Sequence, residues 1–374
     1  MSEAKGMDIK MEKPQLIIIM KNAGVSCNIG CVYCIEEQKQ YSSSQKFITI
    51  EQAEELARMT QKYSLNVLFH GGEPTLLRPD YYEKLMDIFE EYNDDVFFGM
   101  QTNATQIDDQ WINFLKNNKE RIGISVSLDG PEEVNRFRLT KQGGSTFNLV
   151  YRNINKLFED GIQTGLLCTV VSSSIGKEEE LYNMITSFSN LKFVKINPCM
   201  DKNSDGTLPF WAVTPKQYYS FISNFFDIML KKGNWRYNIE PIISVLKRLQ
   251  GVRSAYCNYN DEKCPNFLTI YPDGTITSCD NYNLQHGLIG RLYEISDLDA
   301  ALNMEQNFEL KKSYTRLLEK CEKCDVNNLC SGGCIAVRER YSDTEEYCEA
   351  IKGMIHHIKI VYDALKNKTD GNSI

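Results

Sequence analysis

Thirteen cysteines in a chain of 374 residues are the feature of this sequence that most clearly indicates chemistry. Three of them, Cys27, Cys31 and Cys34, lie near the start, and Cys168 and Cys199 stand alone in the middle. The other eight crowd the last third: Cys257, Cys264, Cys279, Cys321, Cys324, Cys330, Cys334 and Cys348. An odd number cannot be fully paired in disulfides. In a reducing compartment such a set indicates metal ligation or thiol chemistry.

The composition is that of a folded protein with a sizeable core, since 42% of the residues are hydrophobic and 25% are charged. A formal net charge of −8 argues against general nucleic-acid binding, which needs clustered Lys and Arg. No run approaches the roughly 18 apolar residues of a membrane span, and the polar N-terminus does not resemble a signal peptide. We therefore expect a cytoplasmic protein that binds neither nucleic acid nor membrane.

The first cysteine group has the spacing Cys27-x3-Cys31-x2-Cys34, which places three thiolates in one short loop. A [4Fe–4S] cluster usually takes four cysteine ligands, so three would leave one iron open to a non-protein ligand. Zinc is the competing interpretation, although a structural zinc site takes four protein ligands. Three buried or free thiols are the remaining alternative.

The region from about residue 14 to 232 alternates short β-rich runs with amphipathic stretches. The expected strands are 15–20, 66–70, 96–101, 122–128, 164–171 and 192–197. The expected helices are 50–63, 80–92, 108–117, 146–160 and 177–188, with Thr49 and Asp108 as N-caps. This order predicts an α/β fold with a parallel sheet, curled into a partial (β/α)6 TIM-like barrel. In such folds the chemistry sits at the carboxyl ends of the strands, where the first cysteines and Gly71-Gly72-Glu73 fall.

The predicted domains are a partial barrel over 14–235, a helical linker over 236–255 and a small cysteine-rich α+β domain over 256–374. The boundary rests on the change from alternating strands and helices to short strands, turns and cysteines. Residues 266–278 are expected to form a hairpin around the turn Pro272-Asp273-Gly274.

The segments C27-NIG-C31-VY-C34 and H70-GGEPTLL resemble the signature of the radical S-adenosylmethionine (SAM) superfamily. The resemblance implies that Cys27, Cys31 and Cys34 hold a [4Fe–4S] cluster whose open iron binds SAM. It further implies that reductive cleavage of SAM yields a 5′-deoxyadenosyl radical, which abstracts hydrogen from a substrate. Cofactors supply such radical chemistry, and the protein orients and shields it.

The resemblance also implies a set of SAM contacts at the strand ends. Glycines permit close backbone approach to a ligand, and the Glu73 carboxylate can receive a cationic amine. The predicted SAM-binding residues are Gly71, Gly72, Glu73, Gln101, Asn103, Ser127 and Tyr33. Taken singly, each of these segments also suits a polar turn. Relatives often continue with a His-Asp-x-x-Arg pattern that this chain lacks, so we assign Arg138 no catalytic role from sequence.

The C-terminal cysteines resemble the SPASM domain of radical SAM enzymes that modify peptides and proteins. By that resemblance Cys257, Cys264, Cys279 and Cys334 hold one auxiliary [4Fe–4S] cluster, and Cys321, Cys324, Cys330 and Cys348 hold a second. Two zinc ribbons are the alternative. Cys168 is then expected to be a core residue, and Cys199 either a core residue or a thiol facing the cavity.

Asp280 directly follows Cys279, at the position of the proposed general base of anaerobic sulfatase-maturating enzymes. A carboxylate beside a cluster and a substrate cavity is placed to accept a proton while a substrate radical is oxidised. A turn aspartate that caps local N–H groups is the alternative. His70, before the glycines, is a candidate to line the same cavity.

Two enzymatic functions fit this resemblance, and the sequence favours the maturation of a ribosomally made peptide through carbon–carbon or thioether crosslinking. Oxidation of a Cys or Ser of a sulfatase to formylglycine is the alternative. The preference rests on His70, where sulfatase maturases usually have glutamine, and on Ile335-Ala336, where they often have two arginines. The expected partners are a peptide or protein substrate, with or without a leader peptide, and a reductant such as flavodoxin or ferredoxin. An iron–sulfur carrier or zinc-binding adaptor is the non-enzymatic alternative.

Overall fold

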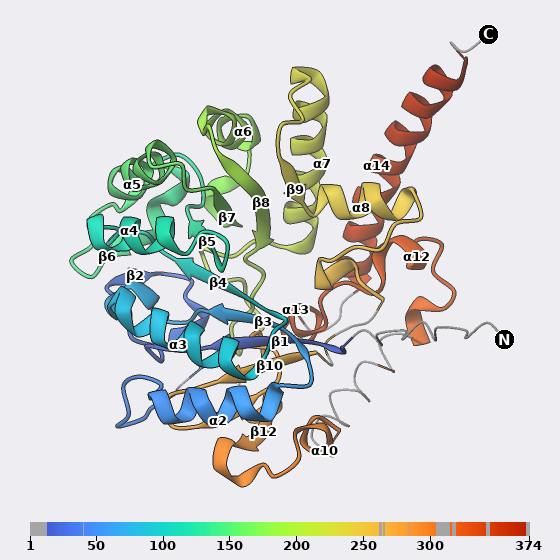
Figure 1. The fold of residues 1–374 in the computed structure, drawn as a ribbon. Coiled ribbons are helices and arrows are strands. Elements are labelled where there is room, and N and C mark those ends of the chain that lie inside the picture. The colour runs from blue at the N-terminus through green and yellow to red at the C-terminus, as the bar shows by residue number, and fades with distance from the viewer. Residues whose placement is uncertain are drawn as a thin grey trace, which may run out of the picture.

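The structure is a computed structural model that describes residues 13–39, 41–261, 264, 266–282, 284–303, 315, 319–341 and 345–371. It is built on one ten-stranded sheet with the strand order β12-β11-β10-β1-β3-β4-β5-β7-β8-β9 (Figure 1). The sheet is open, with β12 and β9 at its edges, so the described strands form a partial barrel and not a closed one. The predicted α/β class is confirmed.

Six parallel strands correspond to the six predicted ones, each within a few residues. They are β1 (Gln15–Met20), β3 (Ser64–Phe69), β4 (Val96–Thr102), β5 (Ile122–Ser127), β7 (Thr164–Val170) and β8 (Leu191–Pro198). The helices between them are α2 (Ile50–Thr60), α3 (Pro79–Tyr92), α4 (Asp109–Asn117), α5 (Phe147–Glu159) and α6 (Glu178–Ser187). Both predicted N-caps are confirmed, because the Thr49 side chain accepts from the Gln52 N–H and that of Asp108 from the Trp111 N–H.

Two short elements that the sequence did not reveal hold the first cysteine loop. Strand β2 (Ile29–Cys31) pairs antiparallel with β6 (Arg138–Thr140), outside the main sheet. Helix α1 (Ile35–Gln38) follows directly after Cys34. Strands of three residues are too short to show a hydrophobic period.

The C-terminal region continues the main sheet. Strand β10 (Phe267–Ile270) pairs in parallel with β1, and the predicted hairpin forms between β10 and β11 (Thr275–Thr277), followed by β12 (Leu288–Arg291). β1 therefore lies between β3 and β10, which accounts for its continuous apolar sequence. The division into domains stays a prediction, but hydrogen bonds join the two regions through the sheet.

The segment expected to be a helical linker contains a strand as well. Here β9 (Asn238–Glu240) pairs in parallel with β8, between α7 (Pro215–Lys232) and α8 (Ile242–Leu249). The long helix α14 (Glu345–Gly371) packs against α7 and α8 (Figure 1). The remaining described helices are short: α9 (Leu284–Gly287), α10 (Leu298–Leu302), α12 (Asn327–Cys330) and α13 (Ile335–Arg340).

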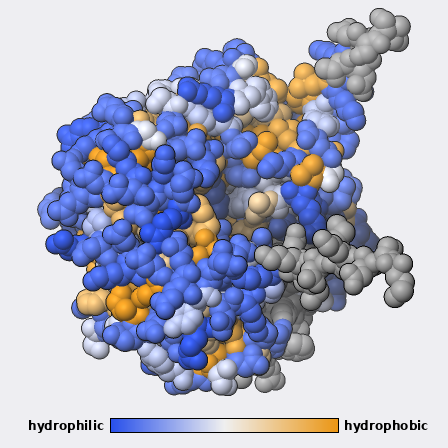
Figure 2. All heavy atoms as spheres, viewed as in Figure 1, coloured by the Kyte–Doolittle hydropathy of each residue, from blue (hydrophilic) through white to orange (hydrophobic). Residues whose placement is uncertain are grey.

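The face drawn in Figure 2 is mainly hydrophilic. Apolar side chains gather on it near α14, whose Ile360 and Leu365 are exposed. Among the described helices, none combines the length and the apolar character needed to cross a bilayer.

Candidate active site

The loop that carries Cys27, Cys31 and Cys34 lies against the carboxyl ends of β1 and β3. The Glu73 N–H donates to the Ser26 carbonyl at 2.8 Å. Gly72 has φ +54°, and a Cβ there would lie 2.1 Å from the same carbonyl, so only glycine permits this approach. On the other side Cys31 pairs with Arg138 in the β2–β6 ladder. The loop is therefore fixed between two backbone contacts.

Glu73 joins the ends of two neighbouring strands. Its Oε1 accepts from the Thr75 N–H at 3.0 Å and from the hydroxyls of Thr75 and Thr102 at 2.6 Å each, and its Oε2 accepts from the Asn103 N–H at 2.7 Å. The side chain is 1% exposed. Four donors leave little acceptor capacity on this carboxylate. Its predicted pairing with a cationic amine stays a prediction.

Asn103 points from the end of β4 to the cysteine loop. Its Nδ2 donates to the Asn28 Oδ1 at 2.9 Å and lies 3.6 Å from the Cys27 Sγ. An N–H directed at a cysteine sulfur is one of the means by which a protein tunes an iron–sulfur cluster. Gln101, half-buried in β4, and Ser127, buried at the end of β5, lie at neighbouring strand ends, as predicted.

A first group of buried polar side chains, the barrel cluster, consists of Tyr33, Asp129 and Arg138. The Tyr33 hydroxyl donates to the Asp129 carboxylate and accepts from the Arg138 guanidinium at 3.1 Å. Asp129 is 1% exposed, and burial raises its pKa, opposed by the positive charge of Arg138. Burial also raises the pKa of Cys31 to about 12, and Arg138 again opposes the shift.

Arg138 is thus a site residue that the sequence did not assign. Its backbone pairs with Cys31 and its side chain contacts Tyr33, so it touches both sides of the cysteine loop. The expected family spacing around Arg138 is absent, and only the β2–β6 pairing reveals its position.

A second group, the bridging cluster, consists of Lys21, Glu36, Lys39, His70 and Asp280. The Lys21 Nζ lies 2.8 Å from the Glu36 Oε1 and 2.9 Å from the Asp280 Oδ2, and the Lys21 side chain is fully buried. The Lys39 Nζ lies 2.9 Å from the same Glu36 oxygen, and the His70 Nε2 lies 3.5 Å from the Asp280 Oδ2. The cluster joins residues 259 positions apart in the chain.

The charges of this cluster act on one another through a medium that excludes most water. Burial opposes ionisation of Asp280, yet the ammonium groups of Lys21 and Lys39 hold the pKa of this carboxyl well below its usual range. Burial and the positive charge of Lys21 lower the pKa of His70 to about 4, although Asp280 opposes the shift. At neutral pH His70 is therefore uncharged, and Asp280 is ionised.

Three of the cysteines predicted to share one auxiliary cluster lie together. Cys264, Cys279 and Cys334 pack around Tyr282, Ile335 and Ala336. Burial raises the pKa of the Cys279 thiol, and the nearby Asp280, Cys334 and Cys264 raise it further. Cys257 and Cys334 both act electrostatically on Tyr256, which places Cys257 on the same side.

Two cysteines of the second predicted set lie beside a buried arginine. Arg338 is 1% exposed, and its guanidinium nitrogens lie 3.8 Å from the Cys321 Sγ and 3.7 Å from the Cys348 Sγ. Cys324 and Cys348 both raise the pKa of Lys352, after the larger effect of its hydrogen bond to Asp325. A buried cation directed at two sulfurs fits thiolates better than neutral thiols.

None of the 13 cysteines is in a disulfide. Thiolates are the donors that iron–sulfur clusters take, and the assignment of these cysteines to particular clusters stays a prediction. Within the described ranges, no three His, Cys, Asp or Glu side chains converge as ligands of a single metal ion do. Of the two remaining cysteines, Cys168 is fully buried in β7, as predicted. Cys199 is half-buried and packs with Tyr33 and Trp211.

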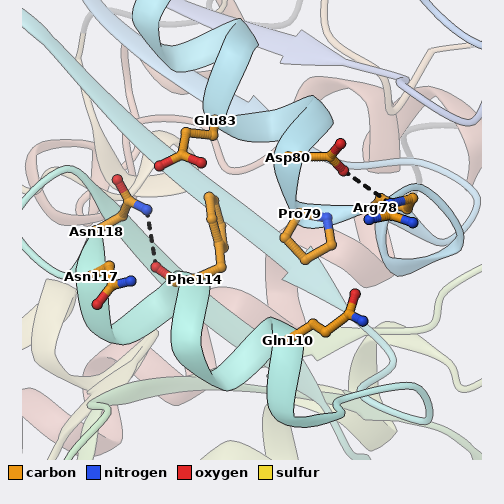
Figure 3. A pocket seen from close by; sticks show the side chains of 8 residues that line it. All are labelled: Arg78, Pro79, Asp80, Glu83, Gln110, Phe114, Asn117 and Asn118. Carbon is orange, nitrogen blue, oxygen red and sulfur yellow. Dashed lines mark hydrogen bonds and ion pairs between the residues drawn. The ribbon is translucent and has the colours of Figure 1, made fainter.

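Two surface pockets lie outside these clusters. One, of about 250 Å³, lies between the start of α3 and the length of α4 and is lined by mainly polar residues such as Arg78, Asp80 and Asn118 (Figure 3). A larger one, of about 720 Å³, extends from Arg78 to Lys156 on α5 and reaches Thr75 and Thr105. Thr105 accepts a hydrogen bond from Asn28, so this pocket lies behind the Cys27 loop.

Comparisons with known proteins agree with this geometry. The Radical SAM superfamily profile matches residues 22–185. A cysteine-type anaerobic sulfatase-maturating enzyme of Clostridium perfringens is 28% identical over 357 residues, covering 91% of this chain and 95% of the relative. A serine-type enzyme of Bacteroides thetaiotaomicron is 25% identical over 389 residues, covering 94% and 92%. The solved structure of native anSMEcpe with bound AdoMet and Cp18Cys peptide has a TM-score of 0.82 at 25% identity, covering 95% of this chain and 100% of that chain.

The chain contains a radical SAM domain over residues 22–185, the domain of enzymes that act with SAM and [4Fe–4S] clusters as cofactors. Along nearly its whole length it is similar to anaerobic sulfatase-maturating enzymes. The sequence-based preference for peptide crosslinking is therefore corrected, because these relatives favour the alternative. The peptide-bound SuiB structure of Streptococcus suis, at 15% identity and a TM-score of 0.58, shares the fold alone.

Proposed function

We propose that this radical SAM enzyme oxidises the side chain of a Cys or Ser residue in a protein substrate to an aldehyde, the formylglycine of sulfatases. The similarity to sulfatase-maturating enzymes of both the cysteine and the serine type supports the substrate class. The observation that carries the proposal is the contact between His70 and Asp280. His70 precedes the predicted SAM motif and Asp280 follows Cys279. Their contact supports a site in which one substrate binds next to both residues.

The proposed ligand sets are those predicted from the sequence. Cys27, Cys31 and Cys34 would hold the SAM-binding cluster, with Gly71, Gly72, Asn103 and the neighbouring strand ends around SAM. When bound, the cluster and SAM supply a 5′-deoxyadenosyl radical. The C-terminal cysteines would hold two auxiliary clusters in a SPASM-type region, and Arg338 would neutralise part of the charge of the second.

The reaction balances as a two-electron oxidation of the substrate carbon. Loss of a hydrogen atom from the Cβ of a Cys leaves a carbon radical beside the S–H group. Loss of the S–H proton and one electron then gives a C=S bond, and water converts this to the aldehyde and hydrogen sulfide. An auxiliary iron–sulfur cluster held by the C-terminal cysteines would supply the oxidant for this electron, and a base of the bridging cluster, for which the sequence predicts Asp280, would accept the proton.

The partners follow from this chemistry. A one-electron reductant such as flavodoxin or ferredoxin would reduce the SAM-binding cluster, and the substrate is a polypeptide, with or without a leader segment. Cluster-binding thiols are best kept in a reducing compartment, which supports a cytoplasmic location.

The test is anaerobic reconstitution followed by incubation with SAM, dithionite and the Cp18Cys peptide or its Ser counterpart. We expect 5′-deoxyadenosine together with a peptide mass in which CHO replaces the CH2SH or CH2OH group. Formation of 5′-deoxyadenosine with neither peptide oxidised, while a crosslinked peptide forms from another substrate, would contradict the proposal.

A further inference from the structure

His70 occupies a fixed position between the two halves of the site. Its backbone N–H donates to the Met20 carbonyl at 3.0 Å, at the end of β1. Gly71, which follows, rests on the Lys21 stem, where a Cβ would lie 2.0 Å from the Lys21 Cδ. The His70 ring lies with its Nε2 3.5 Å from the Asp280 Oδ2. Backbone and ring are thus both held in place.

His70 is also the most accessible member of the bridging cluster. Its side chain is 25% exposed, compared with 15% for Asp280, 8% for Glu36 and none for Lys21. The Asp280 oxygen that faces His70 already accepts from the Lys21 ammonium. Among the described residues, the carboxylates of Glu36 and Asp280 each contact a lysine ammonium group. The structure gives no such contact for the His70 imidazole within the described residues.

We propose that His70 accepts the proton released when the substrate radical is oxidised, with Asp280 and Lys21 as positioning residues. The His70 Nε2 lies 3.5 Å from the Asp280 Oδ2, and the neutral imidazole takes the S–H or O–H proton. The electron goes to an auxiliary iron–sulfur cluster, so atoms and electrons balance. This assignment rests on the proposed function and replaces Asp280 as the base.

The charges around His70 keep it in the form that this role needs. Lys21 after β1, Glu36 on α1, Lys39 at the C-cap of α1 and Asp280 after β11 are the charged groups around the ring. Burial and the positive charges of Lys21 and Lys39 lower its pKa to about 4, and the carboxylates of Asp280 and Glu36 oppose this shift. A neutral imidazole is an acceptor, whereas an imidazolium is a donor only. The Asp280 carboxylate lies beside the ring, where its negative charge would stabilise the imidazolium formed by proton transfer.

The experiment compares H70Q, D280N and the control H357Q in the reconstituted holoenzyme. His357 pairs with Asp227 on the surface, away from the cysteines. Three quantities are measured: 5′-deoxyadenosine formation, oxidation of the Cp18Cys peptide, and the Kd of that peptide. We expect H70Q to lower peptide oxidation about 100-fold, the size of a general-base effect. Cleavage of SAM and the Kd should stay within about threefold of the unmodified enzyme, as should all three quantities in H357Q.

The outcomes separate the alternatives. A H70Q enzyme that oxidises the peptide at an undiminished rate while D280N does not would identify Asp280 as the base. A Kd raised as much as oxidation falls would make His70 a recognition residue and overturn the inference. An H70A enzyme whose oxidation is restored by added imidazole would support it. If the unmodified enzyme cleaves SAM but oxidises neither the Cys nor the Ser peptide, the proposed function itself fails, and this inference with it.

Discussion

The barrel cluster and the bridging cluster flank the same cysteine loop but differ in what they join. Tyr33, Asp129 and Arg138 all come from the barrel and contact one another within a span of about a hundred residues. The bridging cluster reaches from Lys21 at the end of the first strand to Asp280 behind Cys279. The first cluster can act only on the loop of Cys27, Cys31 and Cys34, which is proposed to bind SAM. The second couples that loop to the C-terminal cysteines.

The comparison implies a division of labour between SAM cleavage and substrate oxidation. Residues of the barrel cluster contact Cys31 and its neighbours, so substituting them should mainly impair formation of the 5′-deoxyadenosyl radical. Residues of the bridging cluster lie between the two cysteine regions, so their loss should separate radical formation from product formation. The predictions run from the largest expected effect to the smallest.

Removing a proposed ligand on each side should give opposite patterns. We expect C31A to abolish 5′-deoxyadenosine formation, and C348A to keep it while losing peptide oxidation, because one iron site binds SAM and the other does not. Each variant should lose about four of about 12 iron atoms per chain. Iron analysis and chromatography of the reaction mixture measure the two effects. Undiminished iron in C199A is the control, since Cys199 packs against Trp211 and is a proposed ligand of neither cluster.

Replacing Lys21 in the bridging cluster or Arg138 in the barrel cluster should lower the free energy of unfolding by similar amounts. The two substitutions should affect different reaction steps. K21M and R138M each leave a buried carboxylate without its ammonium or guanidinium partner, which costs about 3 kcal/mol. We expect R138M to lower SAM cleavage, and K21M to lower peptide oxidation more than SAM cleavage. Urea unfolding and the two product assays measure these effects. Equal loss of both products in K21M would remove the distinction between the clusters.

The pH profile of K21M should differ from that of the unmodified enzyme. With its pKa near 4, His70 stays neutral throughout the range above about pH 5. Loss of the Lys21 charge removes one cause that lowers this pKa, while burial, the larger cause, remains, so the pKa rises only part of the way from about 4 towards its ordinary value of about 6.5. His70 in K21M then becomes protonated at a higher pH than in the unmodified enzyme, and peptide oxidation by K21M should begin to fall as the pH drops below about 6.5. Matching profiles for both enzymes would contradict the assignment of His70.

The long elements of the barrel could be predicted because their periodicity reflects burial. All six strands and five helices between residues 15 and 198 appear in the structure near their predicted bounds. β1 is recognisable as a central strand from its apolar run, and the Thr49 cap from its place before an amphipathic stretch. Here the local sequence and the tertiary packing favour the same structure.

What could not be predicted depends on contacts between distant segments. Lys21 follows an apolar strand and gives no sign that it will be fully buried between Glu36 and Asp280. The pairing of β10 with β1 joins residues about 250 positions apart, and no local pattern encodes it. Arg138 was set aside because its spacing departs from the family pattern, whereas its pairing with Cys31 brings it to the site. Buried polar partners are fixed by the fold as a whole.

The smallest expected effect concerns a neutral connection between the same two regions. The Gln52 side chain completes the capping box of α2, and its Nε2 donates to the Pro272 carbonyl in the C-terminal hairpin at 2.8 Å. T49A removes only the cap and should cost about 1 kcal/mol. Q52A keeps the bond from the residue-52 N–H to the Thr49 hydroxyl but removes the acceptor of the Thr49 N–H and leaves the buried Pro272 carbonyl without its donor, so about 2 kcal/mol is expected. Equal urea midpoints for the two variants would show that Pro272 adds nothing. A larger loss of stability in Q52A than in T49A, with undiminished SAM cleavage, would show that the Gln52–Pro272 hydrogen bond joins the barrel to the C-terminal hairpin without affecting the chemistry. The coupling between the two cysteine regions would then depend on the charges around Lys21.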